Sequence, residues 1–364
     1  MIKNLILSLT ALAGLPSVAV CAETAPDVQT RPQVQFEAVQ TRLQAQFEAL
    51  VEDGFTGVVI LALDGETIWS GTSGLADPAQ GRLIDLDTQF DIASVTKTLT
   101  GMIAADLIEQ GLLAPDTRFG DVFGDAPTPF DGLTLHQLLT HSAGLVDVVG
   151  EDAEALSAET QRARLYQTEL RFEPGQGYFY SNLGYSLVAQ MLEAVTGQSY
   201  EALLMAYLAR AGIDSTGYAL AADRDQMIIF EDGVALDEAS WGGHPPGWTL
   251  IGNGGLASSA RELMAWRLAY QAGQLTAPEA VARAHQPYQA EDQAGRSYYG
   301  YGLVVEDDPE RGRIYWHNGG SRRFNAHWRS YADDGLTLVA LSNQWQVTAD
   351  QVEQHLSAVW FDAR

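Results

Sequence analysis

The stretch GVVILALDGETIWSG, residues 57–71, predicts a β-hairpin that decides the class of fold. Residues 57–63 form a strand-like apolar run, and Asp64 with Gly65 is a typical two-residue hairpin turn. Residues 66–71 then return as a second strand. A helical pattern precedes the hairpin, and its apolar face carries Phe36, Val39, Leu43, Phe47 and Leu50.

The last part of the chain mirrors the first. Its strand-like runs cover residues 299–305, 313–317, 324–331 and 336–343. Thr348 is expected to cap a last helix, whose apolar face carries Val352, Leu356, Val359 and Trp360. The strands therefore gather near both ends of the chain.

Between these ends, residues 91–284 have mostly helical patterns with long loops. We therefore expect an α/β fold of the α+β type. One antiparallel sheet would be formed by both chain ends, with flanking terminal helices and an inserted, mostly helical lobe. No linker or internal repeat divides the chain, so we expect a single domain over residues 33–364, with a site between sheet and lobe.

The composition excludes several classes of function. The chain has 364 residues, of which 21 are Lys or Arg and 47 are Asp or Glu, giving a formal net charge of −26. Such an acidic surface repels phosphate backbones and anionic lipids, so we expect no nucleic-acid binding and no charge-driven membrane binding. Cys21 is the only cysteine, which excludes an intrachain disulfide and a cysteine metal site.

The N-terminal segment has the features of a secretory signal peptide. Its apolar run over residues 5–20 is short for a membrane span. Small residues precede a cleavage point after Ala22, so we predict a signal peptide over residues 1–22. The protein would be periplasmic or secreted, without membrane insertion after cleavage. The less favoured alternative is a lipoprotein anchored at Cys21, because Val20 is larger than such sites usually accept.

The lysine content points to one residue. Lysine occurs only at Lys3 and Lys97, so the other 19 of the 21 basic residues are arginines. Lys97 would be the only lysine left after removal of the signal peptide. Because a guanidinium does not lose its proton, a lysine retained among arginines is a candidate for proton chemistry.

Ser94 and Lys97 stand three residues apart at the start of a helical pattern that ends at Gly111, so their side chains share a face. The free N–H groups of a helix start suit a nucleophilic serine whose attack creates an oxyanion. Lys97 can take the serine proton only if burial lowers its pKa from ~10.4 to about 7. The alternative is a capping serine followed by an exposed lysine.

A second motif is Tyr180-Ser181-Asn182. In an extended segment Tyr180 and Asn182 point the same way, because side chains alternate. The phenol can then transfer a proton, and the amide can hold a substrate carbonyl. The alternative is a buried aromatic residue with a capping asparagine.

The third motif is HNGG, residues 317–320, at the end of a predicted strand. Gly319 and Gly320 allow a ligand to lie against the strand edge. The N–H of Gly320 can be the second oxyanion donor, opposite the N–H of Ser94. The alternative is a tight turn between strands, which two glycines would also serve.

Together and in this order, the motifs resemble the serine hydrolase superfamily of class C β-lactamases, serine DD-peptidases, D-aminopeptidases and related esterases. The resemblance runs from about Val34 to Trp360. It includes LHQLLTHSAGL at residues 135–145, a Pro-Gly pair at 174–175 and GGLAS at 254–258. It implies the β-lactamase/transpeptidase-like fold.

The resemblance also implies a role for each motif residue. Ser94 is the acylated nucleophile, Lys97 its base partner, Tyr180 the general acid/base and Asn182 a substrate contact. His317 is the third-motif residue; β-lactamases proper usually have Lys-Thr-Gly there, whereas His-x-Gly is more like the peptidases and esterases. Whether Lys97 or Tyr180 is the acylation base stays open.

We therefore expect an exported serine hydrolase that forms an acyl-enzyme with an amide or ester of a small molecule or peptide. No metal or organic cofactor is expected. The alternatives are a class C-like β-lactamase, for which Arg322 or Arg323 could supply the charge missing at residue 317, and a non-catalytic relative that binds peptidoglycan or peptide. The remaining histidines are expected to be structural or surface residues: His136, His141, His244, His285, His327 and His355.

Overall fold

The computed structural model describes residues 33–292 and 294–363. Internal contacts divide the chain into two compact units, residues 1–38 and 39–364. Helix α1 (Gln33–Glu52) crosses this boundary, and every other described element belongs to the second unit.

The predicted signal peptide over residues 1–22, with its alternative of a lipidated Cys21, lies outside the described residues. Within the described ranges, no helix is both long and apolar enough to cross a membrane. Cleavage and export therefore stay predictions, as does the extent of the single domain.

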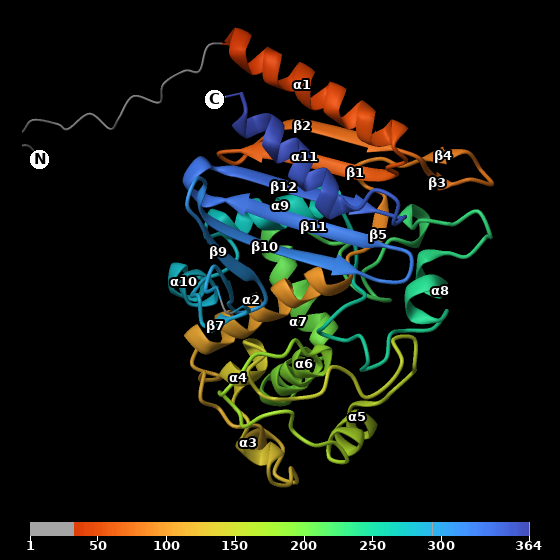
Figure 1. The fold of residues 1–364 in the computed structure, drawn as a ribbon. Coiled ribbons are helices and arrows are strands. Elements are labelled where there is room, and N and C mark those ends of the chain that lie inside the picture. Colours follow the sequence, from red (N-terminus) through yellow and green to blue (C-terminus); the bar gives the residue numbers. More distant parts are fainter. Residues whose placement is uncertain (1–32, 293, 364) are drawn as a thin grey trace, which may run out of the picture. The chain divides into compact units, whose positions relative to one another are not determined.

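One antiparallel sheet of eight strands forms the centre of the second unit (Figure 1). Strand β12 lies between β1 and β11, and Gly57 of β1 pairs with Ser342 of β12. Both chain ends therefore complete the same sheet, as predicted. In spatial order the strands are β2 (Glu66–Ser73), β1 (Gly57–Leu63), β12 (Leu336–Ser342), β11 (Asn325–Tyr331), β10 (Gly312–Gly320), β9 (Val304–Asp308), β8 (Ser297–Tyr299) and β7 (Gln289–Ala290).

Both faces of this sheet are covered, because alternate residues of β1 enter two different cores. Val59 and Leu61 pack in a cluster with α11 (Ala349–Phe361) and with the part of α1 from Val39 onward. Val58 and Ile60 face a larger cluster that includes α2 and α9. This explains why the run at 57–63 is continuously apolar rather than alternating. The predicted cap of α11 is confirmed: Thr348 and Gln351 form a capping box.

The larger cluster is built mainly by helices between β5 and β7, as the predicted fold class requires. Two small sheets accompany them: β3 (Leu75–Asp77) pairs with β4 (Arg82–Leu83), and β5 (Gln89–Asp91) pairs with β6 (Ala257–Ser259). The helices are α2 (Thr96–Glu109), α3 (Phe119–Val122), α4 (Leu135–Leu139), α5 (Ala158–Leu165), α6 (Asn182–Thr196), α7 (Tyr200–Leu208), α8 (Leu236–Trp241), α9 (Ala260–Gln271) and α10 (Pro278–Ala284). The 3₁₀ turns are η1 (Ala93–Val95), η2 (Phe130–Gly132), η3 (Ala209–Ala211), η4 (Arg224–Gln226) and η5 (Ala332–Asp334).

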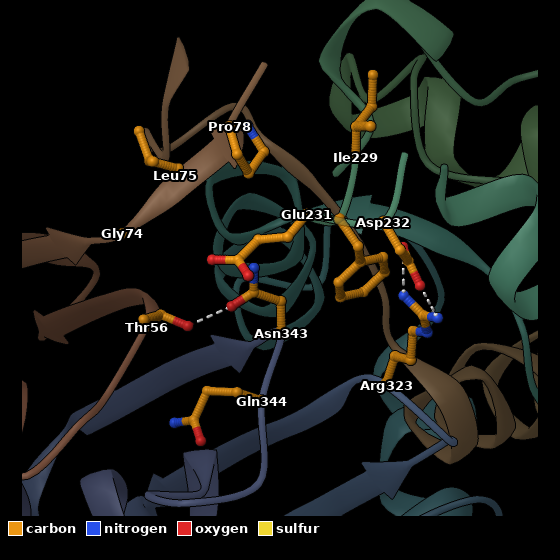
Figure 2. Close-up of a pocket in the computed structure, with 11 residues that line it drawn as sticks. Thr56, Gly74, Leu75, Pro78, Ile229, Glu231, Asp232, Arg323, Asn343 and Gln344 are labelled. Carbon is orange, nitrogen blue, oxygen red and sulfur yellow. Dashed lines mark hydrogen bonds and ion pairs between the residues drawn. The ribbon is translucent and has the colours of Figure 1, made fainter. Parts of the chain in front are cut away.

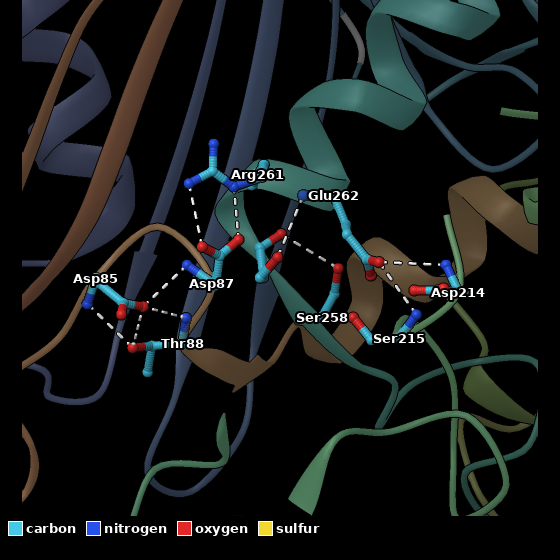
Figure 3. A network of polar contacts seen from close by, with 9 residues as sticks. Asp85, Asp87, Thr88, Asp214, Ser215, Ser258, Arg261 and Glu262 are labelled. Carbon is cyan, nitrogen blue, oxygen red and sulfur yellow. Dashed lines mark hydrogen bonds and ion pairs between the residues drawn. The ribbon is translucent and has the colours of Figure 1, made fainter. Parts of the chain in front are cut away.

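A polar network holds the chain just before β5 against the start of α9 (Figure 3). Arg261 donates from Nε and Nη2 to the carboxylate of Asp87, at 2.5 and 3.1 Å. Glu262 accepts the N–H groups of Asp214 and Ser215. The pair of Arg261 and Asp87 tethers the chain just before β5, and β5 leads directly into η1.

Two predicted strands differ from the structure. The run at 299–305 breaks into β8 and β9, because Gly302 has φ +81° and a Cβ there would lie 2.2 Å from the carbonyl oxygen of Lys97. The strand predicted over 313–317 continues to Gly320 as β10. The alternative of a tight turn at Gly319 and Gly320 is therefore wrong: both residues pair with β11.

Candidate active site

Ser94 lies on η1, the single 3₁₀ turn between β5 and α2, rather than on the α-helix itself. Ala93 before it has φ +44°, a conformation that costs about 1–3 kcal/mol in a non-glycine residue. The buried Asp91 holds this turn: its carboxylate accepts the N–H of Ala93 at 2.7 Å and the hydroxyl of Ser240 at 2.7 Å. Burial raises the pKa of Asp91 above its usual value.

Lys97 is fully buried, so the alternative of an exposed lysine is wrong. Its Nζ lies 3.0 Å from Oγ of Ser94, 2.6 Å from Oδ1 of Asn182 and 2.7 Å from the carbonyl oxygen of Asn253. The last two atoms only accept hydrogen bonds, whereas the serine hydroxyl can also donate. A neutral amine fits this set: two N–H groups serve the two acceptors, and the lone pair faces the hydroxyl of Ser94.

The environment of Lys97 favours this neutral form. Burial lowers its pKa from 10.5 to about 7, although the carboxylates of Asp147 and Asp152 act in the opposite direction. The desolvation of the ammonium group therefore outweighs the attraction of the nearby negative charges, as the sequence argument requires.

Asn182 connects Lys97 to a carboxylate. Its Oδ1 accepts from Lys97, while its Nδ2 and its backbone N–H donate to Oδ1 of Asp147 at 3.0 and 2.9 Å. The cap of α6 is Ser181, which accepts the N–H of Gly184, so Asn182 is not the capping residue. The side chain of Asn182 also lines a hollow beside Ser94, where a substrate carbonyl could reach it.

Tyr180 is half-buried and contacts the same serine. Its hydroxyl is hydrogen-bonded to Ser94, and its ring centroid is 4.8 Å from Nζ of Lys97. Burial raises the pKa of Tyr180 well above its usual range. At the pH at which Lys97 titrates, the phenol is therefore protonated and can donate.

His141 supports this tyrosine, which agrees with the structural role expected from the sequence. It is buried, and its Nδ1 accepts the N–H of Ser181 at 3.0 Å. Its backbone carbonyl accepts the N–H of Phe179, and its ring centroid lies 4.3 Å from that of Tyr180. His141 thus fixes the segment that carries Tyr180.

His317 is buried, and its hydrogen bonds go to Asn318 and Tyr299. Nδ1 lies 2.5 Å from the carbonyl oxygen of Asn318, which only accepts, so Nδ1 carries the proton and Nε2 accepts from the hydroxyl of Tyr299 at 2.8 Å. Burial, together with the charge of Lys97, lowers the pKa of His317 to about 3. The imidazole is therefore neutral, and these bonds do not reach Ser94, Lys97 or Tyr180.

Gly319 and Gly320 bring β10 against η1. The pairing of β10 with β9 ends at Trp316, so the following edge is open toward η1. A Cβ at Gly319 would lie 2.3 Å from the carbonyl oxygen of Ile92 and 2.9 Å from the nitrogen of Ser94. Only glycine permits this approach, which places the predicted pair of oxyanion donors on neighbouring segments.

Two hollows meet at Ser94, and both also include Gly320. One, of about 440 Å³, is lined by Tyr180 and Trp345 among others. The other, of about 340 Å³, contains the charged side chains of Asp91, Glu151, Asp152 and Arg322.

A further hollow of about 630 Å³ contains none of the predicted site residues (Figure 2). Arg323 lies there and is paired with Asp232. Of the two arginines that could replace the missing charge of the third motif, only Arg322 therefore lines a hollow at Ser94.

Three contributors to the site were missed in the sequence. Asp147 follows the segment 135–145 by two residues, and Asn253 directly precedes the segment 254–258. Each residue is therefore next to a motif that the sequence analysis had identified. Trp345 lies between β12 and α11, where the sequence carried no comparable signal.

A serine that shares hydrogen bonds with a buried, deprotonatable lysine and a protonated tyrosine defines a serine hydrolase of the Ser-x-x-Lys class. The chain belongs to the β-lactamase family, whose family model matches residues 43–358. The predicted resemblance is thereby confirmed.

Curated relatives of this chain include an esterase and a D-aminopeptidase. Penicillin-binding protein 4* of Bacillus subtilis is 26% identical over 81% of this chain and 69% of its own length. Esterase EstB of Burkholderia gladioli is 29% identical over 79% of this chain and 85% of its own. A D-aminopeptidase of Brucella anthropi is 25% identical over 79% and 56%. The chain is accordingly a serine hydrolase of the β-lactamase family.

Solved structures show the same fold. A penicillin binding protein from Bacillus halodurans superposes with a TM-score of 0.72 at 23% identity, over 87% of this chain and 99% of that one. An octameric penicillin-binding protein homologue from Pyrococcus abyssi gives 0.73 at 20%, over 88% and 77%. The predicted α+β fold class is confirmed.

Proposed function

We propose that this protein is an exported hydrolase that cleaves an ester or amide of a small molecule or peptide through an acyl-enzyme on Ser94. The observation that carries the proposal is the placement of Nζ of Lys97, which is 3.0 Å from Oγ of Ser94 and otherwise bound to two acceptors. Export rests on the predicted signal peptide, and sequencing of the mature N-terminus after secretion tests it.

In the acylation step, neutral Lys97 takes the proton of Ser94 while Oγ forms a bond to the substrate carbonyl carbon. The carbonyl electron pair moves onto oxygen, and the N–H groups of Ser94 and Gly320 stabilise this oxyanion. When the pair returns, the bond to the leaving group breaks. Tyr180 gives the leaving group its proton and recovers one from Lys97.

Deacylation repeats these steps with water. Water loses a proton to the same groups as its oxygen attacks the ester carbonyl on Ser94, and Ser94 regains its proton as it leaves. Lys97 ends neutral, so each turnover consumes one water and returns the site to its starting state. These steps use only side chains and backbone groups of this chain.

Covalent labelling tests the nucleophile. A fluorophosphonate should add once to the wild type and not to Ser94→Ala, as read by intact-mass spectrometry. Turnover of p-nitrophenyl esters should vanish in the same variant, while its thermal unfolding stays unchanged, because one hydroxyl at a cleft contributes little to stability. An adduct on another serine would disprove the assignment. Absence of both labelling and turnover in the wild type would favour the non-catalytic alternative.

The β-lactamase alternative is disfavoured by His317. This residue stands where β-lactamases usually have a lysine near the antibiotic's carboxylate, and it is neutral, with a pKa of about 3. We expect clear turnover of small uncharged esters and slow or no hydrolysis of nitrocefin, with no gain on acidification from pH 8 to pH 5. Efficient nitrocefin hydrolysis without ester turnover would reverse this ranking.

A further inference from the structure

Trp345 is a large apolar side chain that the fold leaves 52% exposed at the active site. It shares one hollow with Ser94 and Tyr180. A Cβ added to Gly320 would lie 2.8 Å from Cη2 of Trp345, so the edge of the indole covers the segment that holds the second oxyanion donor. An exposed tryptophan in this position is available to a substrate.

The turn that carries Trp345 is held firmly. The side chain of Gln344 accepts the N–H of Val347 at 3.3 Å and donates to its carbonyl at 2.8 Å. The side chain of Asn325, on β11, donates to the carbonyl of Gln344 at 2.5 Å and accepts the N–H of Ala349 at 2.6 Å. The indole is therefore presented by a braced turn and needs little ordering when a ligand binds.

The position of Tyr180 indicates which part of the substrate occupies this hollow. The leaving atom must receive a proton, and the described donor for it is Tyr180, which lines the hollow of Trp345 and not the acidic hollow that contains Asn182. The leaving group therefore departs along Trp345, and the acyl group lies toward Asn182.

The charges in the hollow of Trp345 disfavour an anionic leaving group. Among the described residues, no lysine or arginine lines the hollow of Trp345, and its one carboxylate, Asp350, lies 2.7 Å from Nδ1 of His327. An anionic leaving group would thus meet no positive side chain there. An apolar one would cover the exposed indole.

We propose that Trp345 determines specificity by packing against an apolar leaving group, so that the preferred substrates are esters or amides of an apolar alcohol or amine. This inference rests on the proposed function and narrows its substrate class. A contact with the leaving group affects acylation, and it is absent from the acyl-enzyme.

Alkyl acetates test the inference, because ethyl and hexyl acetate leave the same acetyl-enzyme and their alcohols are equally poor leaving groups. We expect Trp345→Ala to lower kcat/KM for hexyl acetate roughly ten-fold and that for ethyl acetate less than about two-fold. Trp345→Phe should keep most of the preference. The matched control is Leu83→Ala, which removes another exposed apolar side chain outside this hollow and should change neither value.

Ethyl hexanoate separates the two sides of the scissile bond. Its apolar chain is on the acyl side, so Trp345→Ala should leave its ratio to ethyl acetate unchanged. The inference is overturned if Trp345→Ala lowers kcat/KM for ethyl hexanoate and not for hexyl acetate. It is also overturned if kcat/KM falls equally for all three esters, because that result would mean that Trp345 only supports the backbone at Gly320. If the wild type takes no label on Ser94 and hydrolyses no ester, the proposed function itself has failed.

Discussion

Lys97 and Ser94 lie within hydrogen-bond distance, which their spacing along the chain allows, but the charge of Lys97 depends on residues far away in sequence. Asn182 and the carbonyl of Asn253 occupy its two remaining contacts, 85 and 156 residues further on. Two oxygen acceptors and burial leave the amine able to accept the serine proton. A guanidinium in the same place could donate to all three partners but accept from none.

We therefore predict that Lys97→Arg is about as damaging as Lys97→Ala. Both variants lose the base, so kcat/KM for a p-nitrophenyl ester should fall at least about 10²-fold in each. The control is Arg322→Lys, which exchanges the same two side chains at an exposed position of the neighbouring hollow and should retain turnover. Near-wild-type kcat in Lys97→Arg would show that only a positive charge is needed.

The pKa of Lys97 also predicts the pH dependence. Its active form is neutral, and its pKa is about 7, so kcat/KM should rise about ten-fold per pH unit below 7 and level off above it. Because burial raises the pKa of Tyr180 well above its usual range, no decline is expected up to pH 9. A pH–rate profile of the wild type measures this. A flat profile between pH 5 and pH 8 would contradict the role of Lys97 as base.

Among the structural elements, β10 and η1 meet through glycine. The backbone of Gly319 passes so close to Ile92 that a Cβ would overlap its carbonyl oxygen, and the two nearest atoms, this oxygen and the nitrogen of Ser94, belong to the backbone. Neither can move aside as a flexible side chain would. The distance between the two oxyanion donors therefore depends on the absence of a side chain at Gly319.

Gly319→Ala should accordingly damage both folding and catalysis. Forcing the two segments apart is an overpacking change that costs about 1–3 kcal/mol of stability, and the displaced oxyanion donors should lower kcat about 10²-fold or more. Gly124→Ala is the matched control, since a Cβ there meets nothing within 4 Å. Thermal unfolding and ester turnover of both variants measure the two effects. Full activity in Gly319→Ala would show that β10 and η1 do not need a glycine at their closest approach.

At the level of the second unit as a whole, the two chain ends share one core. Leu356 of α11 is fully buried in the cluster that holds Val59 of β1, Leu338 of β12 and Leu43 of α1. Strand β12 lies between β1 and β11, so the N-terminal hairpin joins the rest of the sheet only through this C-terminal strand. The sheet is thus completed only by contacts between distant parts of the sequence.

Leu356→Ala should therefore destabilise the folded unit far from the active site. Removing a buried leucine side chain costs about 2–5 kcal/mol, and the midpoint of thermal unfolding should fall without a change in kcat of the remaining folded protein. Gln354→Ala, at an exposed position of the same helix, serves as the control. Equal unfolding temperatures in the two variants would show that α11 does not contribute to this core.

The sequence by itself determined what depends on local spacing and side-chain chemistry. The hairpin at 57–71, the cap at Thr348 and the shared face of Ser94 and Lys97 follow from patterns within a few residues, and the structure agrees with each. The order of the three motifs was enough to indicate the family.

Only the tertiary structure decided how the site works, because its properties arise from contacts between segments far apart along the chain. Burial beneath distant segments brings the pKa of Lys97 to about 7, and Asp147 fixes the amide that binds it. The strand register turns His317 toward Tyr299 and carries two glycines past Ser94. Desolvation and close backbone approach have no signature in a local pattern, since both depend on what the rest of the chain places around a residue.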